Sequence, residues 1–445
     1  MAARLSWTSP TLPAFFALLA LAPTLHGAAV KMDSKARVAQ DMAPAVRIPV
    51  EPLGFSAPSR FYLTARFSSL TLDFIDADHL LFTFRKGGLL QREPNDPNDD
   101  MDQIIHALVL EASTGKVVNE TVWRMHDREA YLWALGDGKF LVRQRNQLYR
   151  TDEKLQLRPF LHTDSEIQAI SVSPTHRLMA VEYAKYEQEP QTEKAPEADA
   201  AKPMQAPTLG PDAPHLDAEL PQTERHKSTD ILIVKLPEAQ AIARTHTRAP
   251  VNLPMLADGL VIAVEGTKPD QWVVQTSPFH GESAKIGEMQ SACAPTLTAL
   301  SETETMVTGC PGGGSDHSVT VFSTMGGVLW QDRWQPRYIW PTFAFAENGT
   351  RFAYGSLEIN HAVSTLDPVG EDDVIGQPVG VFDTQTGKLE LVKAASPEIS
   401  AGHNYALSAD GREFAILREG AIEIYHLPPA PGTPPQLTPP AQAHR

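Results

Sequence analysis

Aromatic side chains gather between positions 330 and 340, and this group is the first feature of the sequence that could bind a ligand. Flat rings at this spacing can form a platform for a sugar or a proline-rich peptide. The candidate binding residues are Trp330, Trp334, Tyr338 and Trp340, with Tyr131 and Trp133 as a second group. The alternative is burial between packed sheets, where large rings commonly fill the contact.

An acidic segment at residues 96–102 places oxygen ligands at alternate positions, as the start of a calcium loop does. Two positions depart from that pattern. Met101 stands where glycine permits the sharp turn, and Ala107 stands where a bidentate glutamate is needed. The segment is therefore interpreted as a solvated acidic loop, and no metal-ligating residues are assigned.

Signatures of common enzyme classes are missing from the sequence. The 15 histidines include no His-Glu-x-x-His pair, and no Gly-x-Ser-x-Gly nucleophile motif occurs. His79, His106, His126, His162 and His176 have no ligand-like spacing, so each is interpreted as a surface or structural residue. We assign no catalytic residue and no cofactor, although a closed ring of sheets could still bring distant histidines together.

Cys293 and Cys310 are the two cysteines of the chain. The residues between them resemble two short strands about a polar turn, which would bring their ends close enough for a bridge. An oxidising compartment would let them pair, so a structural disulfide is expected, with two small buried thiols as the alternative. Two thiols without a nearby histidine pair cannot complete a tetrahedral metal site.

The elements that must position these residues are repeated hairpins. Residues 107–118 and 380–392 each form an apolar run, a loop ending in Thr-Gly-Lys, and a second apolar run. A second unit recurs at residues 170–181, 343–354 and 405–416, where a strand enters a tight turn and a basic residue leads out of it. Recurrence of such units about every 45 residues predicts the blades of a propeller.

The hairpins at residues 383–388 (Asp-Thr-Gln-Thr-Gly-Lys) and 408–412 (Ser-Ala-Asp-Gly-Arg) resemble those of WD40-like, YVTN-like and quinoprotein-like β-propellers. Residues 126–141 are similar to a motif of secreted bacterial propeller proteins. The resemblance implies an all-β fold and no particular activity. The Trp-Asp and Gly-His dipeptides of strict WD40 blades do not recur, so their cytosolic roles are not implied. The regular tryptophan docking motif of quinoproteins is also missing, so no quinone cofactor is implied.

About 360 ordered residues remain when the signal peptide, the insert and the tail are set aside. At about 45–50 residues per blade, this length favours seven four-stranded antiparallel blades, with eight as the alternative. A strand near residues 46–50 is expected to complete the last blade, which would close the ring and remove exposed edges.

The apolar stretch at residues 12–22 is too short to span a bilayer and precedes Gly27-Ala28-Ala29, so residues 1–29 are predicted to be a signal peptide. Residues 30–58 are a lead-in and residues 59–427 the propeller. The segment at 187–227 is dense in proline, alanine and glutamate and is predicted to be a disordered insert, as is the proline-rich tail at 428–445. A docking arm is the alternative for the insert.

The formal net charge of −16 disfavours nucleic acid as a partner. These features predict a secreted or periplasmic, monomeric, non-enzymatic scaffold for a protein, peptide or envelope ligand, without a transmembrane anchor after signal cleavage. The alternative is an enzyme of lactonase, lyase or glycosidase type with its site in the central channel. Convergent carboxylates or histidines in that channel would favour the enzyme, and an apolar plug would favour the scaffold.

Overall fold

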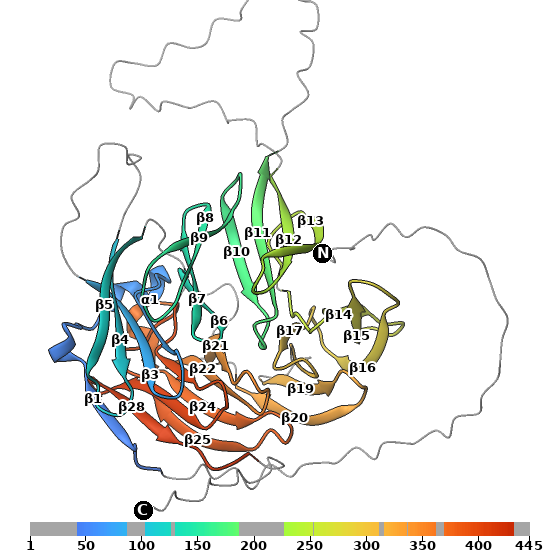
Figure 1. Ribbon diagram of the computed structural model, residues 1–445. Coiled ribbons are helices and arrows are strands. Elements are labelled where there is room, and N and C mark those ends of the chain that lie inside the picture. The colour runs from blue at the N-terminus through green and yellow to red at the C-terminus, as the bar shows by residue number, and fades with distance from the viewer. Residues whose placement is uncertain are drawn as a thin grey trace, which may run out of the picture.

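The computed structural model describes residues 42–86, 103–125, 130–186, 227–251, 253–310, 316–335, 337–361 and 369–430. Seven antiparallel sheets follow one another around a ring (Figure 1). This architecture is a β-propeller, and the prediction of an all-β fold with seven blades is confirmed. The predicted signal peptide, the acidic segment at 96–102, residues 187–226 of the insert and residues 431–445 of the tail lie outside the described residues.

The strands of the first four blades are, for blade 1, β2 (Leu70–Phe74), β3 (His79–Lys86), β4 (Gln103–Glu111) and β5 (Val117–Met125); for blade 2, β6 (Leu132–Gly136), β7 (Lys139–Gln144), β8 (Gln147–Thr151) and β9 (Arg158–His162); for blade 3, β10 (Ile167–Val172), β11 (Leu178–Tyr186), β12 (Lys227–Lys235) and β13 (Gln240–Thr247); for blade 4, β14 (Gly259–Glu265), β15 (Gln271–Pro278) and β16 (Ala284–Gln290).

The remaining strands are, for blade 5, β17 (Thr296–Ala299), β18 (Glu304–Gly309), β19 (His317–Ser323) and β20 (Val328–Trp334); for blade 6, β21 (Tyr338–Phe345), β22 (Arg351–Ile359), β23 (Val374–Gly376), β24 (Pro378–Asp383) and β25 (Leu389–Ala394); for blade 7, β26 (Tyr405–Leu407), β27 (Glu413–Arg418), β28 (Ala421–His426) and β1 (Val46–Pro49). Three short helices complete the described residues: η1 (Glu51–Leu53), α1 (Phe61–Ala65) and η2 (Glu371–Asp373). No helix in these residues has the length and apolar character needed to cross a membrane.

Two blades depart from the four-stranded pattern. Blade 4 has three strands, because only residues 291–295 separate β16 from β17. Blade 6 carries the additional short strand β23, which pairs with β22 beyond the point where β24 pairs with it. Neither departure changes the order of the first strands of the blades.

The N-terminal strand closes the ring. β1 pairs with β28 in antiparallel register, with Ile48 opposite Ile422, at the segment where the sequence predicts a closing strand. Figure 1 shows this contact between the first and last coloured parts of the chain. Closure of this kind joins chain ends that are far apart in the sequence and pairs an edge that would otherwise be open.

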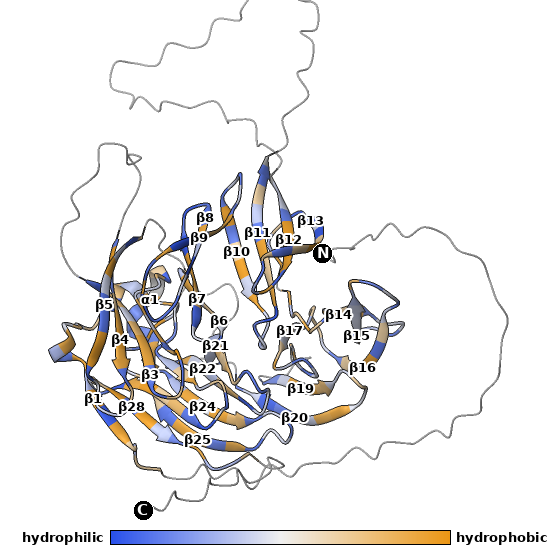
Figure 2. Cartoon of the chain, viewed as in Figure 1, coloured by the Kyte–Doolittle hydropathy of each residue, from blue (hydrophilic) through white to orange (hydrophobic). Residues whose placement is uncertain are grey.

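Each pair of consecutive blades shares a hydrophobic core. Apolar and polar residues alternate along many strands, as Figure 2 shows, so each sheet presents apolar side chains to its neighbours. One such cluster joins blade 7 to blade 1 through Ile48, Leu72 and Ile422, all at most 3% exposed. Six similar clusters join the other consecutive blades.

The first strand of each blade lies toward the centre of the ring. β2 contacts β26, β26 contacts β21, β6 contacts β10, and β14 contacts β17. The residues that end these strands therefore meet around the central channel, although they come from different parts of the sequence.

Candidate functional site

Two cavities occupy the central channel. The first has a volume of about 550 Å³ and is called the acidic compartment here. The second has a volume of about 720 Å³ and is called the aromatic compartment. The two are neighbours, because they share the lining residues Val172, Phe343, Phe345 and His403.

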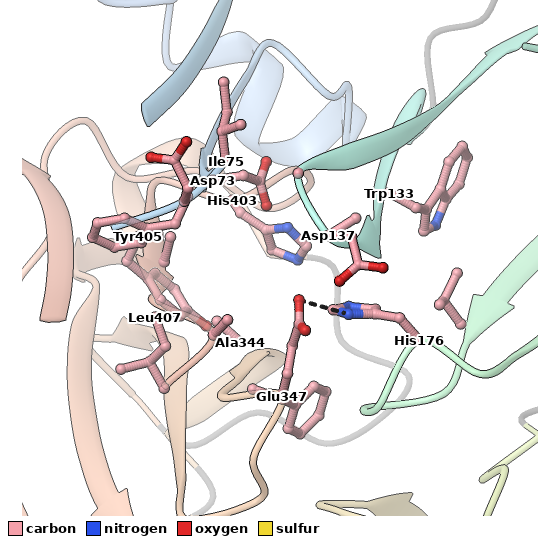
Figure 3. Close-up of a pocket in the computed structure, with 18 of the residues that line it drawn as sticks. Asp73, Ile75, Trp133, Asp137, His176, Ala344, Glu347, His403, Tyr405 and Leu407 are labelled. Carbon is pink, nitrogen blue, oxygen red and sulfur yellow. Dashed lines mark ion pairs between the residues drawn. The ribbon is translucent and has the colours of Figure 1, made fainter. Parts of the chain in front are cut away.

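Carboxylates from several blades converge on the acidic compartment. Its acidic and histidine lining residues are Asp73, Asp76, Asp137, Glu153, Glu347, His176 and His403, and Tyr405 adds a hydroxyl group. Figure 3 shows that the labelled ones among them come from different sheets and lie around one space. Among the described residues, the lining of this compartment includes neither lysine nor arginine.

Asp73 lies on β2, between apolar neighbours, and its side chain is enclosed by protein on the side away from the cavity. Burial raises the pKa of Asp73 to about 8, since a low-dielectric surrounding disfavours the charged carboxylate. This carboxyl group is therefore mostly protonated at neutral pH when the cavity holds no cation.

A chain of hydroxyl groups lies beside Asp73, at the contact between blades 1 and 2. The Tyr131 hydroxyl lies 2.7 Å from the Thr83 Oγ1, which lies 2.8 Å from the Thr71 Oγ1. All three side chains are buried. Burial raises the pKa of the Tyr131 hydroxyl, and the nearby Asp73 charge raises it further.

His403 lines both compartments and precedes β26. Its backbone carbonyl accepts a hydrogen bond from the Leu72 amide at 2.8 Å, which fixes the loop against β2 one residue before Asp73. Burial lowers the pKa of His403, so its imidazole is neutral at physiological pH.

Two ion pairs lie at the turns around the acidic compartment. His176 Nδ1 lies 3.1 Å from Glu347 Oε1, which joins the turn after β10 to the turn after β21 (Figure 3). Asp76 Oδ1 lies 3.0 Å from His79 Nδ1. Burial opposes ionisation of Asp76, but the Asp78 amide and His79 outweigh it and lower the pKa of Asp76.

Rings and hydroxyl groups line the aromatic compartment. Trp334 and Tyr354 are 4.2 Å apart between ring centroids, and Phe343 lies 5.4 Å from Tyr354. Burial raises the pKa of Tyr354 to about 12, so this hydroxyl stays protonated. Among the described residues, the lining contains no carboxylate, lysine or arginine, and its polar part is formed mostly by threonines such as Thr298 and Thr308.

The predicted disulfide is present and forms part of this wall. Cys293 and Cys310 are bonded, with their Cα atoms 5.6 Å apart, and both line the aromatic compartment. Ser291 supports the bridge, because its hydroxyl accepts a hydrogen bond from the Cys310 amide and donates one to the Cys293 carbonyl.

The aromatic residues named from the sequence separate into two sets. Trp334 and Tyr338 line the aromatic compartment, and Trp133 lines the acidic one. Trp330 and Tyr131 are buried between blades, at 4% and 0% exposure.

Trp330 and Trp340 are held in place by packing, and Trp330 also by a hydrogen bond. The Trp330 indole N–H donates to the Thr384 carbonyl at 2.9 Å, and its ring stacks with Phe352. Trp340 packs beside the cluster around Leu63, with the Arg66 guanidinium 5.3 Å from its ring centroid. Neither tryptophan lines a channel compartment.

Sequence reasoning missed Asp73, Asp137, Glu347 and His403. The signal for Asp73 was a single charged residue within the apolar strand β2. His176 was interpreted as a surface or structural residue, and the structure places it in the acidic compartment, paired with Glu347. In the described residues, no group of three or more histidine, cysteine, aspartate or glutamate side chains is arranged to hold a metal ion.

No protein-family model matches the chain, and no curated protein matches it. Similar solved structures include the acylaminoacyl peptidase of Pyrococcus horikoshii, at TM-score 0.43 and 10% identity, covering 84% of this chain and 54% of the peptidase. The β-propeller domain of the Trilobed protease from Pyrococcus furiosus matches at TM-score 0.41 and 9% identity, covering 81% of this chain and 95% of that domain. The C-terminal WD40 domain of Sif2 matches at TM-score 0.39 and 9% identity, covering 88% of this chain and 99% of that domain. The chain spans about half the length of the peptidase.

Proposed function

We propose that this protein is an exported, monomeric, non-enzymatic binding protein that holds a peptide or envelope-derived ligand in its central channel. The observation that carries the proposal is the pair of adjoining cavities, of about 550 and about 720 Å³, which share four lining residues. Volumes of this size suit small molecules and short peptides.

The walls of the channel support binding without large rearrangement. Many lining residues lie on or next to inner strands such as β2, β10 and β21, which are held by the interblade cores. Trp334 lies at the end of β20, the outermost strand of blade 5. A preformed site of this kind avoids much of the entropy cost of ordering loops around a ligand. The rings of Trp334, Tyr338 and Phe343 supply flat apolar surface for it.

A channel-centred enzyme of lactonase, lyase or glycosidase type is the second candidate. Asp73 favours it, because a partly buried carboxyl group with a pKa of about 8 resembles a general acid at neutral pH. The two functions differ in one measurable respect. A binding protein releases its ligand unchanged, whereas an enzyme converts it to product on repeated turnover.

The proposal is tested with the mature protein, residues 30–445, in a thermal-shift screen of short peptides and oligosaccharides, followed by calorimetric titration of each stabilising compound. Trp334→Ala is expected to weaken binding about tenfold or more, because an aromatic anchor in the cavity is removed. Trp340→Ala is the matched control, because this ring lies outside both compartments, and it should leave the Kd within about twofold.

Mass spectrometry of the recovered compound distinguishes the two candidates. Recovery of intact ligand after long incubation supports the binding protein, and accumulation of product supports the enzyme. A screen in which no compound binds, or in which Trp334→Ala and Trp340→Ala weaken binding equally, would overturn the channel as the binding site.

A further inference from the structure

The central channel carries negative charge at one end only. Five carboxylates line the acidic compartment, and among the described residues neither lysine nor arginine lines it. The aromatic compartment is lined by apolar side chains, hydroxyl groups and histidine. A ligand that fills both compartments must therefore match a charged end and a neutral end.

Most of the carboxylates already have a cationic or polar neighbour. Asp76 pairs with His79, and Glu347 pairs with His176. Asp137 Oδ2 lies 3.8 Å from Lys139 Nζ. The side chains of Asp137 and Glu153 are both exposed. These groups border the compartment and do not require a ligand for their stability.

Asp73 differs from them. No hydrogen bond or ion pair joins its carboxyl group to another described residue, although protein encloses it on the side away from the cavity. Placing an unpaired carboxylate in such surroundings is unfavourable, and a cation in the cavity would remove that penalty. Asp73 is the one carboxyl group of the compartment that is partly buried and has no partner among the described residues.

Resting on the function proposed above, we propose that the channel ligand bears an organic cation, an ammonium or guanidinium group, that binds Asp73 in the acidic compartment. The uncharged, apolar part of the same ligand lies in the aromatic compartment, against Trp334 and Phe343. His403, which lines both compartments, lies at their junction. An anionic ligand end would face carboxylates without a compensating lysine or arginine.

Binding of a cation to Asp73 must be coupled to release of the proton that Asp73 carries. Burial raises the pKa of Asp73 to about 8, so below that pH a bound cation displaces the Asp73 proton. The ionisable groups that line the same space are Asp76, Asp137, Glu153, Glu347, His176, His403 and Tyr405, and the buried Tyr131 hydroxyl lies close enough to interact with Asp73. Burial raises the pKa values of Tyr131 and Tyr405 and lowers that of His403, so burial favours the neutral form of all three.

The experiment uses three acetylated, amidated tetrapeptides, Trp-Ala-Pro-Arg, Trp-Ala-Pro-norleucine and Trp-Ala-Pro-Glu, titrated into the mature protein. The arginine peptide is expected to bind at least tenfold more tightly than the norleucine peptide, and the glutamate peptide more weakly than both. The affinity of the arginine peptide should rise severalfold from pH 6.5 to 8.5, because its guanidinium does not titrate in this range.

Asp73→Asn is expected to reduce the preference for arginine over norleucine to threefold or less and to abolish the pH dependence. The affinity for the norleucine peptide should stay within twofold. Asp372→Asn is the matched control, because it makes the same substitution in the exposed helix η2, outside both linings. It should leave all three affinities and the pH dependence unchanged.

The two proposals fail in different ways. Equal binding of the three peptides that still depends on Trp334 would overturn the cation proposal and leave the channel as the binding site. An arginine preference that persists in Asp73→Asn would also overturn it. Absence of binding by any compound in the screen would overturn the proposed function itself.

Discussion

At the scale of single residues, Asp73 is the side chain whose environment conflicts most with its chemistry. It follows Leu72, which packs into the core between blades 7 and 1. Side chains alternate along a strand, so Asp73 lies on the face of the sheet toward blade 2, where it borders the acidic compartment. A charged group kept there without a partner costs stability. Such a cost is typical of residues that serve a ligand and not the fold.

Asp73→Asn should therefore stabilise the ligand-free protein in a pH-dependent way. The folded-state pKa of about 8 lies above the unfolded value of about 3.9, so the folded state binds more protons between them and stability falls as pH rises through that window. Asparagine does not titrate, so the Asp73→Asn variant lacks this loss of stability at rising pH. The advantage of Asp73→Asn over the wild type should grow by about 3.5 kcal/mol between pH 5 and pH 8.

Urea unfolding at both pH values measures this difference, with Asp372→Asn as the control for a simple change of charge. If the stability curves of Asp73→Asn and the wild type run parallel from pH 5 to pH 8, the raised pKa of Asp73 is wrong.

At the scale of elements, the Thr-Gly-Lys hairpins do more than turn the chain. Gly115 and Gly387 have φ values of +72° and +65°, which glycine adopts without strain. Each also lies under a side chain from another strand. A Cβ atom at Gly115 would lie 2.4 Å from Ile48 of β1, and one at Gly387 would lie 2.5 Å from the Trp330 ring. These two turns therefore help to fit neighbouring strands together.

Comparing Gly387→Ala with Gly420→Ala separates the cost of the positive φ angle from the cost of the contact with Trp330. Gly420 has a similar φ of +74° but nothing within 4 Å of an added Cβ. Gly420→Ala should cost about 1 kcal/mol for the backbone alone. Gly387→Ala should cost about 2 kcal/mol more, because Trp330 must shift.

Denaturant unfolding gives both values, and tryptophan fluorescence should change only in Gly387→Ala. Equal costs for the two variants would mean that Trp330 adjusts freely and does not depend on this turn.

At the scale of the whole molecule, stability depends on closing the ring. Ile48 of β1 packs in the cluster that joins blade 7 to blade 1, where Leu72 and Ile422 also lie. Arg351 joins blade 6 to blade 7 and to the segment that follows β28. Its guanidinium donates to Glu390 of blade 6 at 2.6 Å and to the carbonyls of Gly411 and Pro428 at 2.8 and 2.5 Å.

Ile48→Ala is expected to lower the free energy of unfolding by about 3 kcal/mol, because it removes buried methyl groups and leaves a cavity at the closure. Val118→Ala, at a position 56% exposed on β5, is the matched control and should cost less than about 0.5 kcal/mol. Thermal and urea unfolding measure both. A cost for Ile48→Ala as small as that for Val118→Ala would show that the ring holds without β1.

Local features of the sequence were enough to predict the repeated hairpins, the seven blades and the bridge between Cys293 and Cys310. Each depends on residues close together in the chain: alternation along a strand, a glycine in a tight turn, or two cysteines flanking a hairpin. Burial of Trp330 and exposure of Trp334 to the channel could not be told apart from sequence, because both rings belong to the same strand, β20.

The candidate site was decided by the tertiary structure alone. Asp73, His176, Glu347 and His403 come from blades 1, 3 and 6 and from the loop into blade 7, and they share a compartment because the ring places the inner strands around one channel. Ring closure depends on packing between blades distant in sequence, and no local pattern records which side chains then converge. The sequence by itself determined the repeating sheets, and the closed ring determined which of their polar residues meet.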